Sequence, residues 1–349
     1  WHDNHSFQTF FDTSSLVPRI FYHVRTSFCF LCGRVFMATC TKVIIQLMSS
    51  HAIPASTPPP IHAIDRWWGP RELEYLCHLK SAIENQYPHA SEGKNLLLIA
   101  FCRLLIQISN ASFNHQSISF KDTKRRQMPL FSNVQGFDEM FLRELDIILE
   151  SANYNPPSKT EVVYGDSRNV AQYVSGKYNL LITSPPYPNR ISYIRELRPY
   201  MYWLGYLKEG KEAGELDWEA IGGTWGIATS RLSKWKKSSK GYYPLYYVHL
   251  LDKISDSGNK NGYLMANYIA RYFEDIWNHL QSVIMVLSPG SKVHYIVGNS
   301  SFYGIQLPVE QIYRDMLEAL KFKNVCIKPI RKRNSKKTLF EYDVTACWA

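Results

Sequence analysis

The polar groups most able to do chemistry in this chain follow the apolar run 178–183, YNLLIT, which has the composition of a short buried strand. Proline fixes φ and has no N–H, so Pro185 and Pro186 would leave two carbonyls in fixed directions. Ser184 precedes them with a hydroxyl, and Tyr187 follows with a planar ring. These groups could accept hydrogen bonds from the exocyclic amine of a flat molecule that stacks on the ring.

A second polar pair follows another apolar run, TEVVYGD at residues 160–166. If this run is a strand, Asp166 and Ser167 lie at its carboxyl end, where ligands bind in open α/β sheets. Asp166 could also be the N-cap of a helix that follows the strand, and the two roles can coexist. The Pro-Pro pair also has an alternative interpretation, in which it forms a turn that only ends the strand and binds nothing.

The two segments together resemble the amino-directed DNA methyltransferases. TSPPY looks like the catalytic motif of that family. A serine at the position of Ser184 resembles the enzymes that methylate N4 of cytosine, because the N6-adenine enzymes usually carry Asp or Asn there. The resemblance extends to VVYGDSRNV and to further segments from residue 52 to the end. It implies a methyltransferase domain over residues 52–349 with S-adenosyl-L-methionine as the cofactor.

The resemblance also implies roles for single residues. The catalytic group would hold the target amine and stack on its base, and consists of Ser184, Pro185, Pro186 and Tyr187. In this family an acidic residue accepts a hydrogen bond from the adenine amino group of the cofactor, and Asp166 takes that place. The expected cofactor-binding residues are therefore Asp166, Ser167 and Thr183.

The reaction implied by the resemblance is direct methyl transfer. The target base is rotated out of the duplex, and its amine attacks the methyl group in line, so that alignment supplies much of the rate. The chain has no Pro-Cys dipeptide, which the C5-cytosine enzymes use for their nucleophile. We expect a site-specific DNA methyltransferase that acts on the N4 amine of cytosine, as in a restriction-modification system; N6-adenine methylation is the alternative within the class.

The elements that must position these residues show two patterns. Between residues 66 and 150, apolar residues recur at helical spacing and predict a helical insertion. After residue 160, short apolar strands alternate with helices, which is typical of an α/β fold with a parallel sheet. We therefore expect a Rossmann-like class I methyltransferase fold, with a mainly parallel sheet, helices on both faces, and a DNA-recognition insertion at 208–262.

Basic and aromatic residues alternate within that second insertion, in the segment RLSKWKKSSKGYY. Cations that neutralise phosphates, interleaved with rings that stack on unpaired bases, suit a nucleic-acid surface. A solvated basic loop is the alternative interpretation. The expected DNA-binding residues are Arg231, Lys234, Trp235, Lys236 and Lys237.

The composition agrees with a nucleic-acid partner. A formal charge of +10 favours a polyanion, here double-stranded DNA with a flipped target base, and a restriction endonuclease would be the cognate protein partner. Further basic runs lie at 121–126 and 331–337. The cysteines include one close pair, Cys29 and Cys32, so we expect reduced thiols in a cytoplasmic protein and no metal site. No apolar run is long enough to cross a membrane.

One part of the family pattern is missing from the sequence. A glycine-rich loop should let the backbone approach the cofactor, yet residues 1–51 contain only the single Gly33. We interpret 1–51 as a degenerate remnant of the cofactor-loop region and expect weak or absent cofactor binding; a loop that has diverged beyond recognition is the alternative. A catalytically inactive DNA-binding relative is therefore the alternative of a different functional class.

Overall fold

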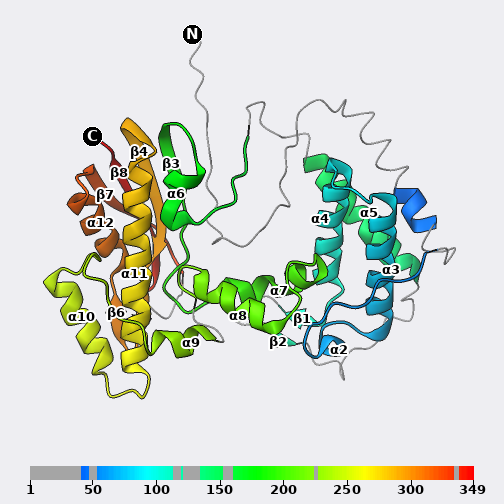
Figure 1. Cartoon of the computed structure of the whole chain (residues 1–349), viewed down its shortest axis with the longest axis horizontal. Helices are drawn as coiled ribbons and strands as arrows, with labels where there is room; N and C mark the ends of the chain where they lie inside the picture. Colours follow the sequence, from blue (N-terminus) through cyan, green and yellow to red (C-terminus); the bar gives the residue numbers. More distant parts are fainter. Residues whose placement is uncertain are drawn as a thin grey trace, which may run out of the picture. The chain divides into compact units, whose positions relative to one another are not determined.

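The computed structural model describes residues 41–46, 53–112, 119–120, 134–151, 160–223, 227–333 and 338–349. They belong to two compact units (Figure 1). One unit, here called the helical unit, contains the described residues up to Val162 together with Arg198–Gly210. The other, here called the sheet unit, contains Val163–Leu197 and Lys211–Ala349.

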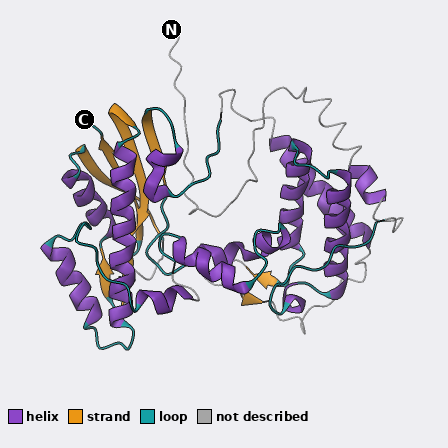
Figure 2. Ribbon diagram, in the orientation of Figure 1, coloured by secondary structure: helices purple, strands orange, loops and turns teal. Residues whose placement is uncertain are grey.

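The helical unit confirms the helices predicted between residues 66 and 150 (Figure 2). Pro70 occupies the first turn of its helix, where a missing N–H costs nothing. The Ser91 hydroxyl caps the next helix by accepting from the Lys94 N–H at 3.2 Å. The elements are α2 (Ile64–Trp67), α3 (Pro70–Gln86), α4 (Glu92–Gln107), β1 (Ala111–Ser112), β2 (Ser119–Phe120) and α5 (Val134–Ser151).

Tryptophans form the centre of the helical unit. The Trp68 indole N–H donates to the Leu105 carbonyl of α4 at 2.9 Å. Its ring packs edge-on against Trp203, the last residue of α7 (Tyr193–Trp203), with 5.7 Å between the ring centroids. Phe101 packs against the same Trp203 ring at 5.5 Å. These aromatic side chains are therefore core residues of this unit.

The sheet unit is an α/β structure around a four-stranded sheet of order β3-β4-β8-β7. The strands are β3 (Tyr178–Thr183), β4 (Leu287–Gly298), β7 (Lys323–Lys332) and β8 (Phe340–Cys347). β3 pairs with β4 in parallel, and both pairings of β8 are antiparallel. The expected mainly parallel sheet is therefore wrong. The short connection at 333–339 accounts for the antiparallel pairing of β7 with β8, since a parallel crossover needs a dozen or more residues.

The strand predicted at 160–166 is also absent, because these described residues form no strand. Val162 is 61% exposed and Tyr164 is 65% exposed, so their side chains have little to pack against. Strand propensity reflects packing on neighbouring strands more than an intrinsic backbone preference. An apolar run alone was therefore insufficient to specify a strand here.

Helices cover one face of the sheet. The remaining elements of this unit are η3 (Ser167–Asn169), α6 (Val170–Tyr173), α8 (Gly210–Glu219), α9 (Ile227–Leu232), α10 (Leu245–Ser255), α11 (Gly262–Ile284), β5 (Ser300–Phe302), β6 (Ile305–Leu307) and α12 (Val309–Ala319). Tyr295 of β4 contacts His279 of α11 and Tyr313 of α12, so both helices lie on the same face. Ile182, on the opposite face, is 38% exposed. The described helices therefore pack on one face of the sheet, whereas we expected helices on both faces.

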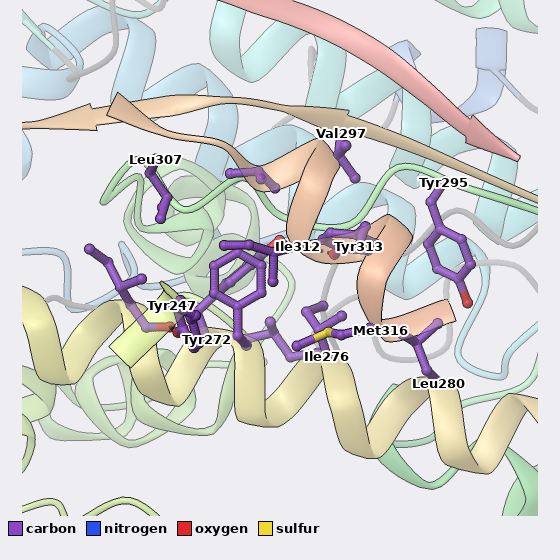
Figure 3. Close-up of a cluster of buried hydrophobic side chains, with 14 of the residues drawn as sticks. Tyr247, Tyr272, Ile276, Leu280, Tyr295, Val297, Leu307, Ile312, Tyr313 and Met316 are labelled. Atoms are coloured by element: carbon purple, nitrogen blue, oxygen red, sulfur yellow. Dashed lines mark hydrogen bonds between the residues drawn. The ribbon is translucent and has the colours of Figure 1, made fainter. Parts of the chain in front are cut away.

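Figure 3 shows the core between the sheet and its helices. Large side chains from α10, α11, β4, β6 and α12 meet there and are fully or almost fully buried; those labelled are Tyr247, Tyr272, Ile276, Leu280, Tyr295, Val297, Leu307, Ile312, Tyr313 and Met316. The buried phenols have partners, since the Tyr272 and Tyr313 hydroxyls lie 3.1 Å apart. This core holds the carboxyl ends of β3 and β4 in place.

Candidate functional site

The TSPPY segment lies at the carboxyl end of β3. Thr183 is the last residue of the strand, is buried, and stands opposite Tyr295 of β4. The strand ends there because prolines cannot donate to a ladder. Pro185 and Pro186 are buried, whereas Ser184 before them is exposed. The two buried prolines thus hold the backbone in place, while the serine before them remains accessible to solvent.

Ser184 lies among hydrogen-bond acceptors. Its hydroxyl donates to the Ile296 carbonyl of β4 at 3.3 Å. Alternatively, the same hydroxyl proton is donated to the Tyr187 phenol oxygen, an interaction that partly offsets the rise in the pKa of Tyr187 that burial causes. No described residue hydrogen-bonds the Pro185 carbonyl. The segment therefore places an exposed serine hydroxyl beside the Tyr187 ring.

Tyr187 is held by residues near the carboxyl terminus of the chain. Its hydroxyl donates to Glu341 Oε1 at 3.3 Å. Arg331 donates to the same carboxylate at 3.1 Å and, chiefly through this hydrogen bonding, lowers the pKa of Glu341. The guanidinium carbon of Arg333 lies 5.1 Å from the centroid of the Tyr187 ring. Tyr187 is consequently fixed at both its hydroxyl and one face of its ring.

The loop after Tyr187 is anchored by buried polar groups. Arg190 adopts a φ of +64°, and its N–H donates to the Tyr268 hydroxyl of α11 at 3.2 Å. The Ser192 hydroxyl donates to the buried Asp217 carboxylate and accepts from the Arg195 N–H at the start of α7. The loop is therefore tied to α11 and to α8.

The expected DNA-recognition insertion reaches the TSPPY segment through Gly222. This residue has a φ of +78°, and a Cβ there would lie 3.9 Å from Pro186 Cβ and 3.6 Å from the Tyr268 hydroxyl. A side chain would be strained by the backbone conformation. The end of α8 therefore approaches the back of the Pro-Pro pair closely.

Asp166 is the N-cap of η3, which confirms the capping alternative. Its carboxylate accepts from the Arg168 N–H at 2.9 Å and from the Arg168 guanidinium at 2.9 Å. The Ser167 carbonyl contacts His279 Nδ1 at 2.7 Å, and His279 Nε2 lies 3.1 Å from the Tyr295 hydroxyl. The turn is thus joined to α11 and to the strand beside Thr183.

These contacts decide how well the described residues fit S-adenosyl-L-methionine. Asp166 directs its carboxylate at Arg168 of its own turn, and Thr183 is buried in the sheet. The segment in which the glycine-rich loop was expected lies outside the described residues, apart from 41–46. Asp166 and Thr183 are therefore engaged within the protein, and Ser167 is linked to the strand position opposite Thr183 through His279 and Tyr295.

The expected DNA-binding residues divide into two kinds. Lys234, Lys236 and Lys237 are exposed. Arg231 instead forms a two-pronged ion pair with Glu215, with N–O distances of 2.7 and 3.0 Å. Trp235 is partly buried and packs against the core of the sheet unit. Arg231 is exposed as well but is paired with an acidic side chain, so the three lysines are the exposed cations of this surface for which no ion pair is seen among the described residues.

Sequence reasoning did not assign Gly298, His279, Arg333 or Glu341 to the site. The basic run at 331–337 was the signal that could have indicated Arg333, but its distance along the chain from Tyr187 concealed the contact. The pair Cys29 and Cys32, the run at 121–126 and residues 334–337 lie outside the described residues. No metal-binding cluster is found among the described side chains, and no described helix has the length and hydropathy of a membrane span.

Comparisons with protein-family models, with curated proteins and with solved structures find no match to this chain.

Proposed function

We propose that this chain is an S-adenosyl-L-methionine-dependent DNA methyltransferase that modifies the N4 amine of cytosine. The observation that carries the proposal is the exposed Ser184 hydroxyl beside Tyr187 at the end of β3. The N4 amine of cytosine needs a hydrogen-bond acceptor for its N–H groups, and the cytosine ring needs a flat apolar surface on which to stack. Ser184, the Pro185 carbonyl and Tyr187 offer these groups within four consecutive residues.

The target base must leave the duplex to reach these groups, because pairing and stacking cover its amine and its faces. Stacking of a base on an aromatic side chain is worth about 1–3 kcal/mol, which offsets part of the cost of unstacking it. The buried prolines give the acceptors a rigid support, so little ordering is needed when the base binds. These residues bind and orient the base, and S-adenosyl-L-methionine would supply the methyl group.

The position of Ser184 in the fold supports the proposal. In open α/β sheets, ligands bind outside the carboxyl ends of parallel strands, and Ser184 follows the strand that pairs in parallel with β4. A Rossmann-like class I methyltransferase fold for the sheet unit is part of this proposal. Lys234, Lys236 and Lys237 would contact the phosphates of double-stranded DNA.

The test is a methyl-transfer assay with labelled cofactor and mixed-sequence DNA, followed by mass spectrometry of the nucleosides. Because we expect weak cofactor binding, the assay uses a large excess of cofactor, and we expect N4-methylcytosine from the wild type at a low rate. Ser184→Ala should transfer about tenfold to a hundredfold more slowly, because one hydrogen bond to the reacting group is removed. The control is Ser301→Ala, which changes an exposed serine of β5. Equal rates for the wild type and Ser184→Ala would contradict the proposed role, and N6-methyladenine would show that the target is adenine.

A second function, DNA binding without methyl transfer, is favoured by the ion pair between Asp166 and Arg168. In this ion pair the Asp166 carboxylate, which was expected to accept a hydrogen bond from the cofactor, accepts from the Arg168 side chain instead. Isothermal titration with S-adenosyl-L-methionine distinguishes the two functions. If the chain only binds DNA, we expect no micromolar binding of S-adenosyl-L-methionine. Salt-sensitive DNA binding is expected in either case.

A further inference from the structure

Arg333 brings a planar cation to one face of the ring on which we propose that the base stacks. Its guanidinium carbon lies 5.1 Å from the Tyr187 ring centroid, within the range of a cation–π contact. These two residues lie far apart in the sequence, and β4 and β8 separate their strands in the sheet. The contact is therefore a product of the tertiary structure.

Backbone and buried polar groups hold Arg333 in this position. Its N–H donates to the Leu339 carbonyl at 2.8 Å, and its guanidinium donates to the Asn299 carbonyl. Asn299 is fully buried and in turn binds the Thr338 carbonyl at 3.1 Å and the Phe340 N–H at 2.9 Å. The guanidinium is thus anchored to the residue that follows β4, and the Arg333 backbone is anchored to the residue that precedes β8.

Gly298 makes this arrangement possible. A Cβ at this position would lie 2.8 Å from Arg333 Cζ and 3.0 Å from two carbons of the Tyr187 ring. Atoms this close must separate, and the flexible guanidinium is the part that can move. An alanine at Gly298 therefore disturbs the contact without removing either residue, because its Cβ displaces the guanidinium and also presses on the Tyr187 ring.

The guanidinium also retains an unused donor. Arg333 Nε is buried and has no hydrogen-bond partner among the described residues. An ion pair with Glu341 would satisfy it, yet Glu341 is occupied by Arg331 and by the Tyr187 hydroxyl. The observed position therefore favours contact with the ring face over a second salt bridge.

We propose that Arg333 is a positioning residue for base binding, which covers one face of Tyr187 so that an unstacked cytosine stacks on the other. This inference rests on the proposed function. By occupying one face and restraining the ring, Arg333 reduces the two stacking modes of a free tyrosine to one, which places the amine consistently beside Ser184. A lysine would be a poor substitute, because its compact ammonium lacks the planar surface of guanidinium.

The experiment uses a single-stranded oligo(dC) that contains one 5-iodocytosine, whose base is already unpaired. Ultraviolet light crosslinks this base to a stacked aromatic ring, and mass spectrometry of the peptides locates the crosslink. In the wild type we expect it at Tyr187. In Arg333→Ala and in Gly298→Ala, we expect the crosslink yield per bound oligonucleotide to fall by about twofold to thirtyfold, from the range of cation–π energies.

Two comparisons separate positioning from charge and from folding. Arg333→Lys keeps the charge and should lose the crosslink as Arg333→Ala does. Lys328→Ala removes one exposed cation from the same strand and should weaken binding while leaving the yield per bound oligonucleotide unchanged. Each variant's thermal unfolding is recorded, and Arg333→Lys supplies the result if Gly298→Ala does not fold.

The outcomes distinguish this inference from the function on which it rests. A Tyr187 crosslink that persists unchanged in Arg333→Ala and Arg333→Lys overturns the role of Arg333 and leaves the proposed function standing. A wild type that crosslinks at no residue of the TSPPY segment contradicts the proposed base site itself. Loss of the crosslink in both Arg333 variants but not in Lys328→Ala supports the inference.

Discussion

The Nη1 atom of Arg168 lies 3.2 Å from Oδ1 of Asp275 in α11, and the same guanidinium pairs with Asp166 at 2.9 Å. Asp275 is buried, and desolvation raises the pKa of its carboxyl group. Its second oxygen has no hydrogen-bond partner among the described residues. Arg168 therefore helps to fasten the turn after residue 166 to α11, beside the contact between the Ser167 carbonyl and His279.

Replacing this arginine should destabilise the protein strongly. Arg168→Ala leaves the buried carboxylate of Asp275 without its closest cation, and breaking such a pair costs about 3–5 kcal/mol. Urea unfolding measures the change in the free energy of unfolding. Arg314→Ala is the matched control, because its pair with Asp315 is half exposed and is worth at most about 1 kcal/mol. Similar losses in the two variants would show that the buried pair has no special weight.

Glu341 should make stability depend on pH. Hydrogen bonding from Arg331 lowers the pKa of this carboxyl group below its ordinary value of 4.5. A lowered pKa stabilises the folded state above pH 4.5, and this contribution falls away as the pH drops through the folded-state value. Since Arg331 is largely exposed and solvent screens the pair, we expect a small contribution.

Urea unfolding of the wild type and Glu341→Gln at pH 7 and pH 3.5 tests this expectation. The stability difference between the two proteins should shrink at the lower pH, where the wild-type carboxylate begins to protonate. A difference that stays constant, or grows, would show that the carboxylate is not stabilised by its arginine.

Asp217 should stabilise the loop that follows Tyr187. It is fully buried and accepts a hydrogen bond from the Ser192 hydroxyl, which itself caps α7. Asp217→Ala removes the acceptor and should cost about 1–3 kcal/mol in urea unfolding. Asp217→Asn keeps an acceptor oxygen and should cost less, while Asp252→Ala on the exposed side of α10 should change stability by no more than about 0.5 kcal/mol. Equal effects of Ala and Asn at position 217 would argue against the hydrogen bond.

The exposed lysines after α9 should contribute to DNA affinity through phosphates. Changing Lys234 and Lys236 together to alanine should weaken binding. It should also reduce the slope of log affinity against log salt by about 0.9 for each phosphate that a lysine no longer neutralises. Fluorescence anisotropy over a range of salt concentrations measures both quantities. Lys253 and Lys260, exposed lysines elsewhere in the sheet unit, form the control pair with the same change in charge. A control pair that behaves identically would assign the effect to net charge alone.

Local pattern was sufficient for the elements in which one face of a helix or strand is buried. The apolar residues at helical spacing within 66–150 predicted α3 and α4, and the apolar run at 178–183 predicted β3, because one face of each element is buried with the period of the backbone. The end of β3 followed from its two prolines, which cannot donate to a ladder. By contrast, residues 160–166 have the composition of a strand and are not one, since a strand requires a partner.

Direction and long-range contact were decided by the tertiary structure. The antiparallel placement of β8 depends on a short connection, and the apolar content of its neighbours is the same for either direction. The ring of Tyr187 meets Arg333 and Glu341 only because β4 and β8 align Gly298 with Glu341. The sequence by itself therefore determined which residue types surround the end of β3. Only the folded chain determined which of their groups remain free, because hydrogen bonds and ion pairs form between residues distant in sequence.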